Sequence, residues 1–250
     1  MRRNFRIIIE YDGADFHGWQ VQPGCRTVQG ELERAVETIT KQKVTVQGAG
    51  RTDAGVHALG QVANFHLEDC LVTAEKMLGG INALTGDDLT VHTIEEVPLD
   101  FAARGGVVSK TYRYRIDNGR HPSPLLRRTH LHISDPLSVE KMSEAARLLE
   151  GHHDFSALRA ADCTDPNPER TIDRCSVAAG GKEITIEVAA KGFLKNMVRI
   201  IAGTLILAGR GKIEPGEMTR ILESRDRTKA GPTAPAHGLV LVHIVYRQDR

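Results

Sequence analysis

The chain has 250 residues, of which 40% are apolar and 26% are charged, and its net charge is +1. This length suits one large domain or two small ones with an ordinary hydrophobic core. The N-terminus lacks the apolar stretch of a secretion signal, and the longest apolar run, residues 200–208, is far too short to cross a bilayer.

Four cysteines lie far apart and form no Cys-x-x-Cys pair: Cys25, Cys70, Cys163 and Cys175. This spacing argues against a zinc ribbon and against a disulfide scaffold. We therefore expect a soluble protein in the reducing cytoplasm, with no membrane association.

The first part of the chain alternates strand and helix patterns. Apolar alternation predicts strands at 5–11, 44–49, 61–66 and 89–97. Helical spacing predicts helices at 28–39, with Thr27 as N-cap, and at 74–84. The resulting order, β-α-β-β-α-β, is that of the ferredoxin-like split motif.

The same order of elements recurs in the second part, without any repeat of the sequence itself. Strands are predicted at 107–116, 172–179, 183–190 and 239–246, and helices at 139–149 and 196–208. A hairpin is expected across Gly180-Gly181. Insertions around 122–124, 160–169 and 210–235 interrupt the pattern.

These patterns predict an α+β fold of two ferredoxin-like (RRM-like) halves related by a pseudo-twofold, with a central, mostly antiparallel sheet. We expect the halves at 1–104 and 105–250, because Ala103-Arg104-Gly105-Gly106 is typical of a boundary. A cleft between two such halves is a favoured place for a binding site.

A glycine-rich loop in the first half contains the strongest candidate for chemistry. It is Gly48-Ala49-Gly50-Arg51-Thr52-Asp53-Ala54-Gly55-Val56-His57-Ala58. Glycine adopts positive φ cheaply and permits close backbone approach, which is typical of a loop with special geometry. Asp53 is a candidate nucleophile or general base. The alternative is an ordinary turn that Asp53 caps and in which Arg51 pairs with it.

Arg199 is the second candidate. It lies in the segment 197–207, which is apolar on most helical faces and is therefore expected to be buried. A buried guanidinium needs a carboxylate partner, because breaking such a pair typically costs about 3–5 kcal/mol. Asp53 of the other half is a plausible partner. The alternative is that Arg199 lies at a polar edge and reaches solvent.

Tyr112 and Tyr114 share one face of a predicted strand, and Arg113 and Arg115 share the other. An aromatic ring on a sheet face can stack on an RNA base. From the residues alone, a core position with a satisfied hydroxyl is favoured for both tyrosines.

Basic residues crowd the stretch 101–130, where Asp117 is the only acid. They are Arg104, Lys110, Arg113, Arg115, Arg120, Arg127 and Arg128. Because Arg suits bidentate contact with phosphate, a nearly neutral protein can still present a basic surface to RNA. The alternative is that the fold pairs these residues with acids from elsewhere.

The histidines and glycines match no metal or nucleotide motif. His152-His153-Asp154 and the pair His130 and His132 lack a recognised ligand spacing, and no GxGxxG or Walker-type loop is present. We expect no metal and no cofactor.

Short blocks of sequence occur in order along nearly the whole chain. They are Tyr11-Asp12-Gly13 with Phe16, Gly18, Trp19 and Gln20; Thr27-Val28-Gln29-Gly30; residues 50–58; Tyr112-Arg113-Tyr114; His153-Asp154-Phe155-Ser156; Arg170-Thr171-Ile172; Gly192-Phe193-Leu194; Met197-Val198-Arg199; and Ala234-Pro235 with Gly238-Leu239. Together they resemble the TruA-type tRNA pseudouridine synthases. One block alone is a weak signal, whereas the whole series in order makes a chance match very improbable.

The resemblance implies an isomerase that converts uridine to pseudouridine at positions 38, 39 or 40 in the anticodon stem-loop of tRNA, without cofactor or metal. It implies that Asp53 is the essential catalytic carboxylate and that Arg199 keeps it ionised. It also implies that Tyr112 packs against the target base and that Arg51 helps to extrude it. Attack on the sugar, addition to the base and removal of a sugar proton are all open to Asp53. A homodimer that binds the anticodon arm is implied in the same way.

Two other classes of function are open on the residues. A non-catalytic RNA-binding protein can use the same split motif, although its usual aromatic strand signature is missing. A small-molecule hydrolase or isomerase can use Asp53 with His57, but this leaves the arginine-rich stretch unexplained.

Overall fold

A computed structural model describes residues 1–247 and confirms the α+β fold. The chain forms two compact units, which we call unit 1 and unit 2. Unit 1 contains Met1–Val108 and the chain from Leu241 onward, and unit 2 contains Ser109–Val240. The last strand, β10 (Leu239–Tyr246), therefore belongs mostly to unit 1, whereas the order of the sequence assigned it to the second half.

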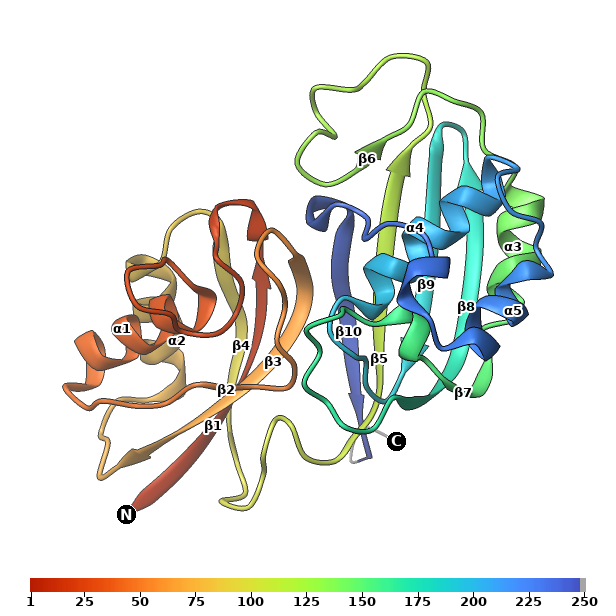
Figure 1. Cartoon of the computed structure of the whole chain (residues 1–250). Coiled ribbons are helices and arrows are strands. Elements are labelled where there is room, and N and C mark those ends of the chain that lie inside the picture. Colours follow the sequence, from red (N-terminus) through yellow and green to blue (C-terminus); the bar gives the residue numbers. More distant parts are fainter. Residues whose placement is uncertain (248–250) are drawn as a thin grey trace. The chain divides into compact units, whose positions relative to one another are not determined.

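Unit 1 is a ferredoxin-like sheet with both of its long helices on one face (Figure 1). Its main strands are β1 (Arg2–Tyr11), β3 (His57–Glu68) and β4 (Leu89–Val97). β1 lies between β4 and β3 and pairs antiparallel with both. The helices are α1 (Val28–Thr40) and α2 (Ala74–Leu84). The element order predicted for this part of the chain is confirmed.

The core of unit 1 follows from the period of its strands and helices. Alternate residues of β1 are buried, so Phe5 and Ile7 point into the core. Phe5 stacks on Phe65 of β3 with 5.7 Å between ring centroids. Thr27 caps α1 as predicted, because its side chain accepts a hydrogen bond from Gly30 N.

The strand predicted at 44–49 is wrong in its extent. Only β2 (Gln47–Gly48) pairs with β3, opposite Asn64 and Ala63. Val46 N donates instead to Glu33 Oε1 on α1 at 2.9 Å. A helix side chain thus takes up a backbone group that a longer strand would have paired in the sheet.

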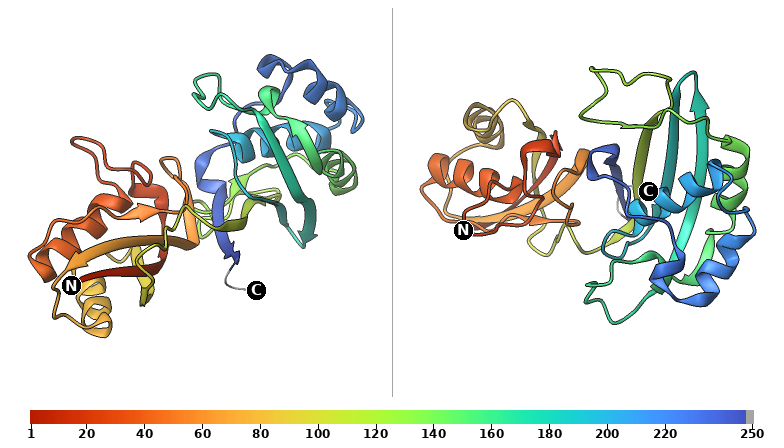
Figure 2. Two further views of the ribbon diagram at one scale, coloured as in Figure 1. Left: turned by 90° about the horizontal axis from the view of Figure 1, so that it is seen from below. Right: turned by 45° about the horizontal axis from the view of Figure 1, so that its top comes forward.

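Unit 2 is built on an antiparallel sheet in the order β5-β9-β8-β7 (Figure 2). The strands are β5 (Val107–Asp117), β9 (Glu183–Ala190), β8 (Glu169–Gly180) and β7 (Gly151–Asp154), and β6 (Leu131–His132) forms a short parallel pair with β5. The predicted hairpin joins β8 to β9, with Gly181 at φ +64° in its turn. α3 (Val139–Arg147) and α4 (Met197–Gly209) pack against each other beside the sheet.

Three strands and helices of unit 2 lie outside the predicted pattern: β6, β7 and α5 (Glu217–Ser224). β6 and β7 are too short to show an alternation. α5 buries Met218, Ile221 and Leu222, whose spacing is helical, but one such turn is a weak signal within a loop-rich insertion. Across residues 1–247, no helix has both the length and the apolar character that a membrane span requires.

Candidate active site

The glycine-rich loop lies between β2 and β3 of unit 1 and holds Asp53 at a tight turn. At the start of the loop, Ala49 N donates to Val62 O at 2.8 Å, and Val56 N closes the turn by donating to Asp53 O at 3.1 Å. The side chain of Asp53 is half-buried. The turn therefore fixes the backbone from which this carboxylate projects.

Arg51, two residues before Asp53, is exposed to solvent. Within residues 1–247 its side chain makes no ion pair or hydrogen bond. The alternative in which Arg51 pairs with Asp53 inside the loop is therefore wrong. An exposed guanidinium beside a half-buried carboxylate is able to bind an external anion such as a phosphate.

The loop that leads from β1 to α1 braces the Asp53 turn through its backbone. Trp19 N donates to Thr52 O at 3.0 Å, and Gly55 N donates to Phe16 O at 3.3 Å. Gly18 has φ +84°, and a Cβ at this position would lie 2.7 Å from Thr52 O. Both the dihedral angle and the close approach require glycine at position 18.

Buried polar side chains from two strands hold the residues just before Asp53. The Tyr11 hydroxyl of β1 lies 2.8 Å from Thr52 Oγ1, and Gln61 Nε2 of β3 donates to Gly50 O at 2.9 Å. Burial raises the pKa of Tyr11 to about 12, although hydrogen bonds with Thr52 and Gln61 act in the opposite direction. The phenol therefore keeps its proton at neutral pH.

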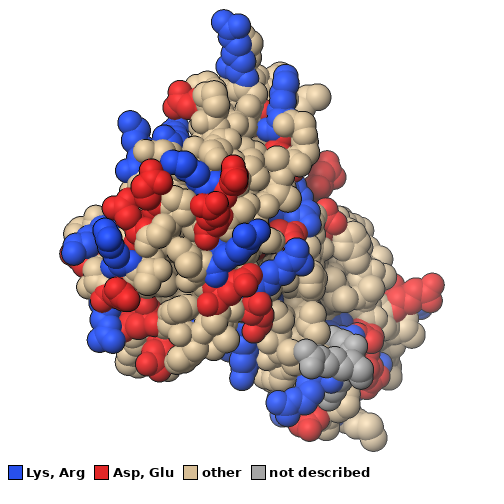
Figure 3. Space-filling model, turned by 90° about the vertical axis from the view of Figure 1, so that its right-hand side faces the viewer, with Lys and Arg blue, Asp and Glu red and all other residues tan. Residues whose placement is uncertain are grey.

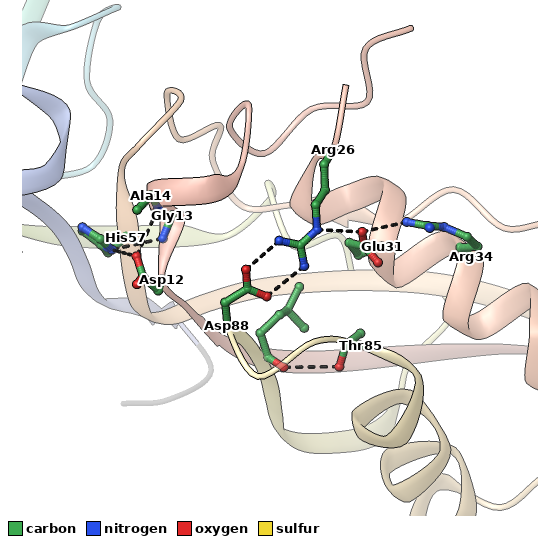
Figure 4. Close-up of polar contacts among 10 residues, drawn as sticks. Asp12, Gly13, Ala14, Arg26, Glu31, Arg34, His57, Thr85 and Asp88 are labelled. Carbon is green, nitrogen blue, oxygen red and sulfur yellow. Dashed lines mark hydrogen bonds and ion pairs between the residues drawn. The ribbon is translucent and has the colours of Figure 1, made fainter. Parts of the chain in front are cut away.

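Figure 4 shows how the bracing loop is attached to the rest of unit 1. The Arg26 guanidinium lies between Asp88, next to the start of β4, and Glu31 on α1. It also covers the Phe16 ring, 4.2 Å from the centroid. Because Phe16 O accepts from Gly55 N, this ion-pair cluster is one step away from the Asp53 turn.

His57 follows the loop and holds the turn at the end of β1. Gly13 N donates to His57 Nδ1 at 3.0 Å, and Asp12 Oδ1 lies 3.0 Å from the same nitrogen (Figure 4). Nδ1 accepts from Gly13 when it carries no proton and donates to Asp12 when it does. This side chain thus joins the Tyr11-Asp12-Gly13 block to the glycine-rich loop.

In unit 2, Tyr112 and Tyr114 of β5 are both buried. Tyr114 donates its hydroxyl to Pro235 O at 2.9 Å, and burial raises its pKa, against the effect of the nearby Arg199 charge. It is a core residue, as the residue pattern favoured. The Tyr112 ring meets Phe193 edge-on, with 5.2 Å between the centroids.

Arg199 lies in the first turn of α4 and is half-buried, so the prediction that it is buried is only partly right. Its Nε donates to Ala234 O at 2.8 Å and its Nη1 donates to Asn196 Oδ1 at 3.1 Å. Ala234 N in turn donates to Arg199 O at 3.1 Å. The direction of the guanidinium is therefore set by the segment around Ala234, and its pairing with Asp53 stays a prediction.

The segment around Ala234 is itself pressed against α4. A Cβ on Gly203 would lie 1.8 Å from Pro232 O, and Gly231 N donates to Thr204 Oγ1 at 2.9 Å. Two glycines thus allow backbone to lie directly on backbone. The contact holds Ala234 where its carbonyl oxygen meets Arg199.

The arginine-rich stretch is only partly neutralised. Arg113 pairs with Glu187 across the β5–β9 ladder at 2.6 Å. The one acid of the stretch, Asp117, is buried and accepts from Gly119 N and Ser123 N instead of from an arginine. Arg120 and Arg127, on the loop between β5 and β6, are exposed. The face drawn in Figure 3 carries basic and acidic side chains side by side and shows no purely basic surface.

Two histidines of unit 2 lie within hydrogen-bonding distance of other groups of the same unit. His130 Nε2 lies 3.3 Å from Glu183 Oε1, and His153 Nε2 lies 2.8 Å from Glu150 O. In the part of the chain that the structure describes, no group of three His, Cys, Asp or Glu side chains is arranged to hold a metal ion.

Comparison with known proteins identifies the family. The family model described as tRNA pseudouridine synthase matches residues 7–104 and 145–247. The chain belongs to the tRNA pseudouridine synthase family. This synthase is accordingly an isomerase that acts on tRNA.

Relatives of the synthase align over nearly the whole chain. The tRNA pseudouridine synthase A of Acetivibrio thermocellus is 46% identical over 244 residues, which make up 98% of this chain and 100% of that protein. The proteins of the same name from Thermoanaerobacter sp. (strain X514) and Rhizobium meliloti (strain 1021) are 45% and 42% identical, over 98% and 97% of this chain and 100% and 99% of their own lengths. A chain in a crystal structure of a Cbf5-Nop10-Gar1 complex matches with a TM-score of 0.34 and 11% identity, over 80% of this chain and 53% of that one.

Several residues that shape the candidate site of the synthase had no role assigned from sequence: Tyr11, Arg26, Gln61, Phe193 and Asn196. Tyr11 and Phe193 lie within the matching blocks, so a signal for them was present. Gln61 and Arg26 act through partners far away in the chain, and local patterns do not reveal such contacts.

Proposed function

We propose that the synthase forms pseudouridine at positions 38, 39 or 40 in the anticodon stem-loop of tRNA, with Asp53 as the essential catalytic carboxylate. The observation that carries this proposal is the braced turn that presents a half-buried Asp53 beside an exposed Arg51. Chemistry on a flipped-out nucleotide needs a catalytic group that is held rigidly and is still open to the substrate.

The reaction exchanges one glycosidic bond for another. The N1–C1′ bond of uridine breaks, the uracil ring turns over, and a C5–C1′ bond forms. The hydrogen at C5 leaves as a proton and N1 gains one, so the product is an isomer and no oxidant or reductant enters the balance. An ionised Asp53 is required whether it attacks the sugar, adds to the base or removes a sugar proton.

Three further residues complete the proposed site. Tyr112, edge-on to Phe193, supports the face of the extruded base. Arg199 pairs with Asp53 and favours its charged form. Arg51 occupies the gap that the flipped nucleotide leaves in the RNA.

We further propose that exposed arginines of the β5–β6 loop bind tRNA phosphates. Arg120 and Arg127 support this, because the acid of their own stretch is already engaged by backbone amides. The resemblance to TruA-type enzymes adds two further proposals, a homodimer and a cytoplasmic location. Sedimentation of the purified protein with and without tRNA tests the homodimer.

The deciding experiment measures tritium release from tRNA that carries 5-tritiated uridine, because formation of the C5–C1′ bond expels this hydrogen. We expect release by the wild type and none by Asp53→Asn, with tRNA binding retained. Asp87→Asn is the matched control, since it removes an exposed carboxylate from the same unit. More than about a tenth of wild-type turnover by Asp53→Asn would contradict the role of the carboxylate.

The two rival functions give different results in the same assay. A non-catalytic RNA-binding protein binds tRNA equally well with either residue at position 53 and releases no tritium. A small-molecule enzyme does not respond to tRNA at all.

A further inference from the structure

We propose that Tyr11 and Gln61 are positioning residues for Asp53. Their side chains fix the backbone of residues 50–52, so that the carboxylate at the next position is held in one orientation. This inference rests on the proposed catalytic role of Asp53.

The loop needs such an anchor because of its composition. Gly50 and Gly55 flank the Arg-Thr-Asp triplet, and glycine loses more conformational freedom on ordering than any other residue. The Arg51 side chain is exposed and provides no attachment to the unit. The side-chain hydrogen bonds that anchor the residues before Asp53 therefore come from β1 and β3, with one bond from each strand.

The anchor on β1 is a pair of buried hydroxyls. Tyr11 is 3% exposed and Thr52 is 6% exposed, and their oxygens lie 2.8 Å apart. Each hydroxyl has one proton to donate and lone pairs to accept, so the bond forms in either direction. With little water near these atoms, the Thr52 side chain has this phenol as its partner, and its rotamer is tied to the backbone next to Asp53.

The anchor on β3 is Gln61, and one of its polar atoms lowers the stability of the fold. This suggests that Gln61 serves the site more than the stability of unit 1. Gln61 is fully buried, and its Oε1 has no hydrogen-bond partner within residues 1–247. An unsatisfied buried carbonyl opposes folding. An apolar side chain of the same shape removes this penalty but also removes the bond to Gly50 O, so the two effects on stability oppose each other. The useful end of Gln61 is thus Nε2, which donates to Gly50 O at 2.9 Å, three residues before Asp53.

The test compares Tyr11→Phe and Gln61→Met with Tyr246→Phe. Tyr246 is a matched control, because it is also buried in unit 1 and donates its hydroxyl to a backbone oxygen, that of Ala103. Single-turnover tritium release with enzyme in excess gives the rate of chemistry, and filter binding gives the Kd for tRNA. We expect about a 10- to 100-fold lower rate for Tyr11→Phe and Gln61→Met, with a Kd within about threefold of wild type. Tyr246→Phe keeps the wild-type rate.

The thermal midpoint separates positioning from a merely structural role. We expect Gln61→Met to have a Tm close to that of wild type while its rate falls, because losing the unsatisfied Oε1 offsets losing the bond to Gly50 O. A structural role lowers the Tm and the rate together. A Tyr11→Phe rate within about threefold of wild type overturns the proposal, as does an equal loss in Tyr246→Phe.

Two further variants cover the remaining outcomes. Thr52→Val removes the Tyr11 bond from the other side, and the double variant Tyr11→Phe/Thr52→Val should be no slower than Thr52→Val alone. Additive losses overturn the proposal. Asp53→Asn is measured in parallel: if it is active, the proposed function fails, and if it is inactive while Tyr11→Phe and Thr52→Val are unimpaired, only the positioning inference fails.

Discussion

Arg26 and Asp88 form a forked ion pair, in which Nη1 lies 2.6 Å from Oδ2 and Nη2 lies 2.8 Å from Oδ1. The same guanidinium donates through Nε to Glu31 at 3.0 Å. Hydrogen bonding to Asp88 is the main cause of the raised pKa of Arg26, so this group is charged at every accessible pH. One side chain thus joins α1, the start of β4 and the loop that braces the Asp53 turn.

The first prediction is that Arg26→Lys destabilises unit 1, because an ammonium cannot reproduce the fork. The Arg26 side chain is 36% exposed, so solvent weakens the pair, and we expect a loss of about 1–2 kcal/mol in the free energy of unfolding. Urea titration measures it. Arg34→Lys is the control, since Arg34 is 67% exposed and pairs with Glu31 within α1. Equal losses of unfolding free energy in the two variants would show that the forked ion pair does not add to the stability of unit 1.

The second prediction concerns the support of Arg199. In Gly203→Ala, the new Cβ would meet Pro232 O at 1.8 Å, so the segment that contains Ala234 must move away from α4. We expect about 1–3 kcal/mol of destabilisation by overpacking, together with slower pseudouridine formation, because Ala234 O no longer orients the Arg199 guanidinium. Both are measured on the same preparation, by urea titration and by tritium release.

The control for this change is Gly216→Ala, because a Cβ on Gly216 meets nothing within 4 Å and its φ is −64°. This variant should keep wild-type stability and activity. If Gly203→Ala behaved in the same way, the close contact between α4 and the Ala234 segment would not be what orients Arg199.

The local part of the fold could be predicted from the sequence, and the long-range part could not. Thr27 and the apolar period after it define α1, because an N-cap and a helical stripe are properties of neighbouring residues. A strand was predicted at 44–49, but β2 has only two residues, because Val46 N donates its hydrogen bond to Glu33 on α1 and not to the sheet. This competition is decided by tertiary packing and leaves no local signal.

The same limit applies to the candidate site. The glycine-rich loop and its Asp53 stand out in the sequence because their composition is unusual. Their supports are ordinary residues, such as Gln61 within a strand and Arg26 before a helix, whose partners lie elsewhere in the chain. Arg199 was expected to be buried and is only half-buried, because a long side chain on an apolar helix can still reach polar atoms at the edge of the helix.

The third prediction is a loss of stability in alkali through Cys175. Burial first, and Glu150 second, raise the pKa of this thiol from 9.0 to about 12. Between these values the unfolded chain releases the proton and the folded chain keeps it, so the contribution is complete below pH 9.0 and falls as the pH rises. Each pH unit in this window removes about 1.4 kcal/mol.

Urea titrations between about pH 8 and about pH 10 test this, a range that stays near or below the ordinary ionisation of tyrosine. Cys175→Ala should make the dependence of stability on pH less steep, whatever its effect on stability at pH 8. Cys25→Ala, which removes a half-buried thiol, is measured in parallel for comparison. An unaltered slope in Cys175→Ala would assign the alkaline loss to other groups.

The fourth prediction separates two arginines of one stretch by their partners. Arg113 is held by Glu187, with its Nη2 2.6 Å from Oε1, whereas Arg127 is exposed on the β5–β6 loop and donates only to Pro124 O among residues 1–247. A phosphate contact releases counterions, so losing one reduces the slope of log Kd against log salt by about 1. Arg127→Ala should therefore weaken tRNA binding and flatten the salt dependence. Arg113→Ala should leave that slope unchanged, because its charge is already neutralised by Glu187. If both variants kept the wild-type slope, the β5–β6 loop would not bind tRNA phosphates, and the electrostatic contact would have to be sought among the other exposed arginines.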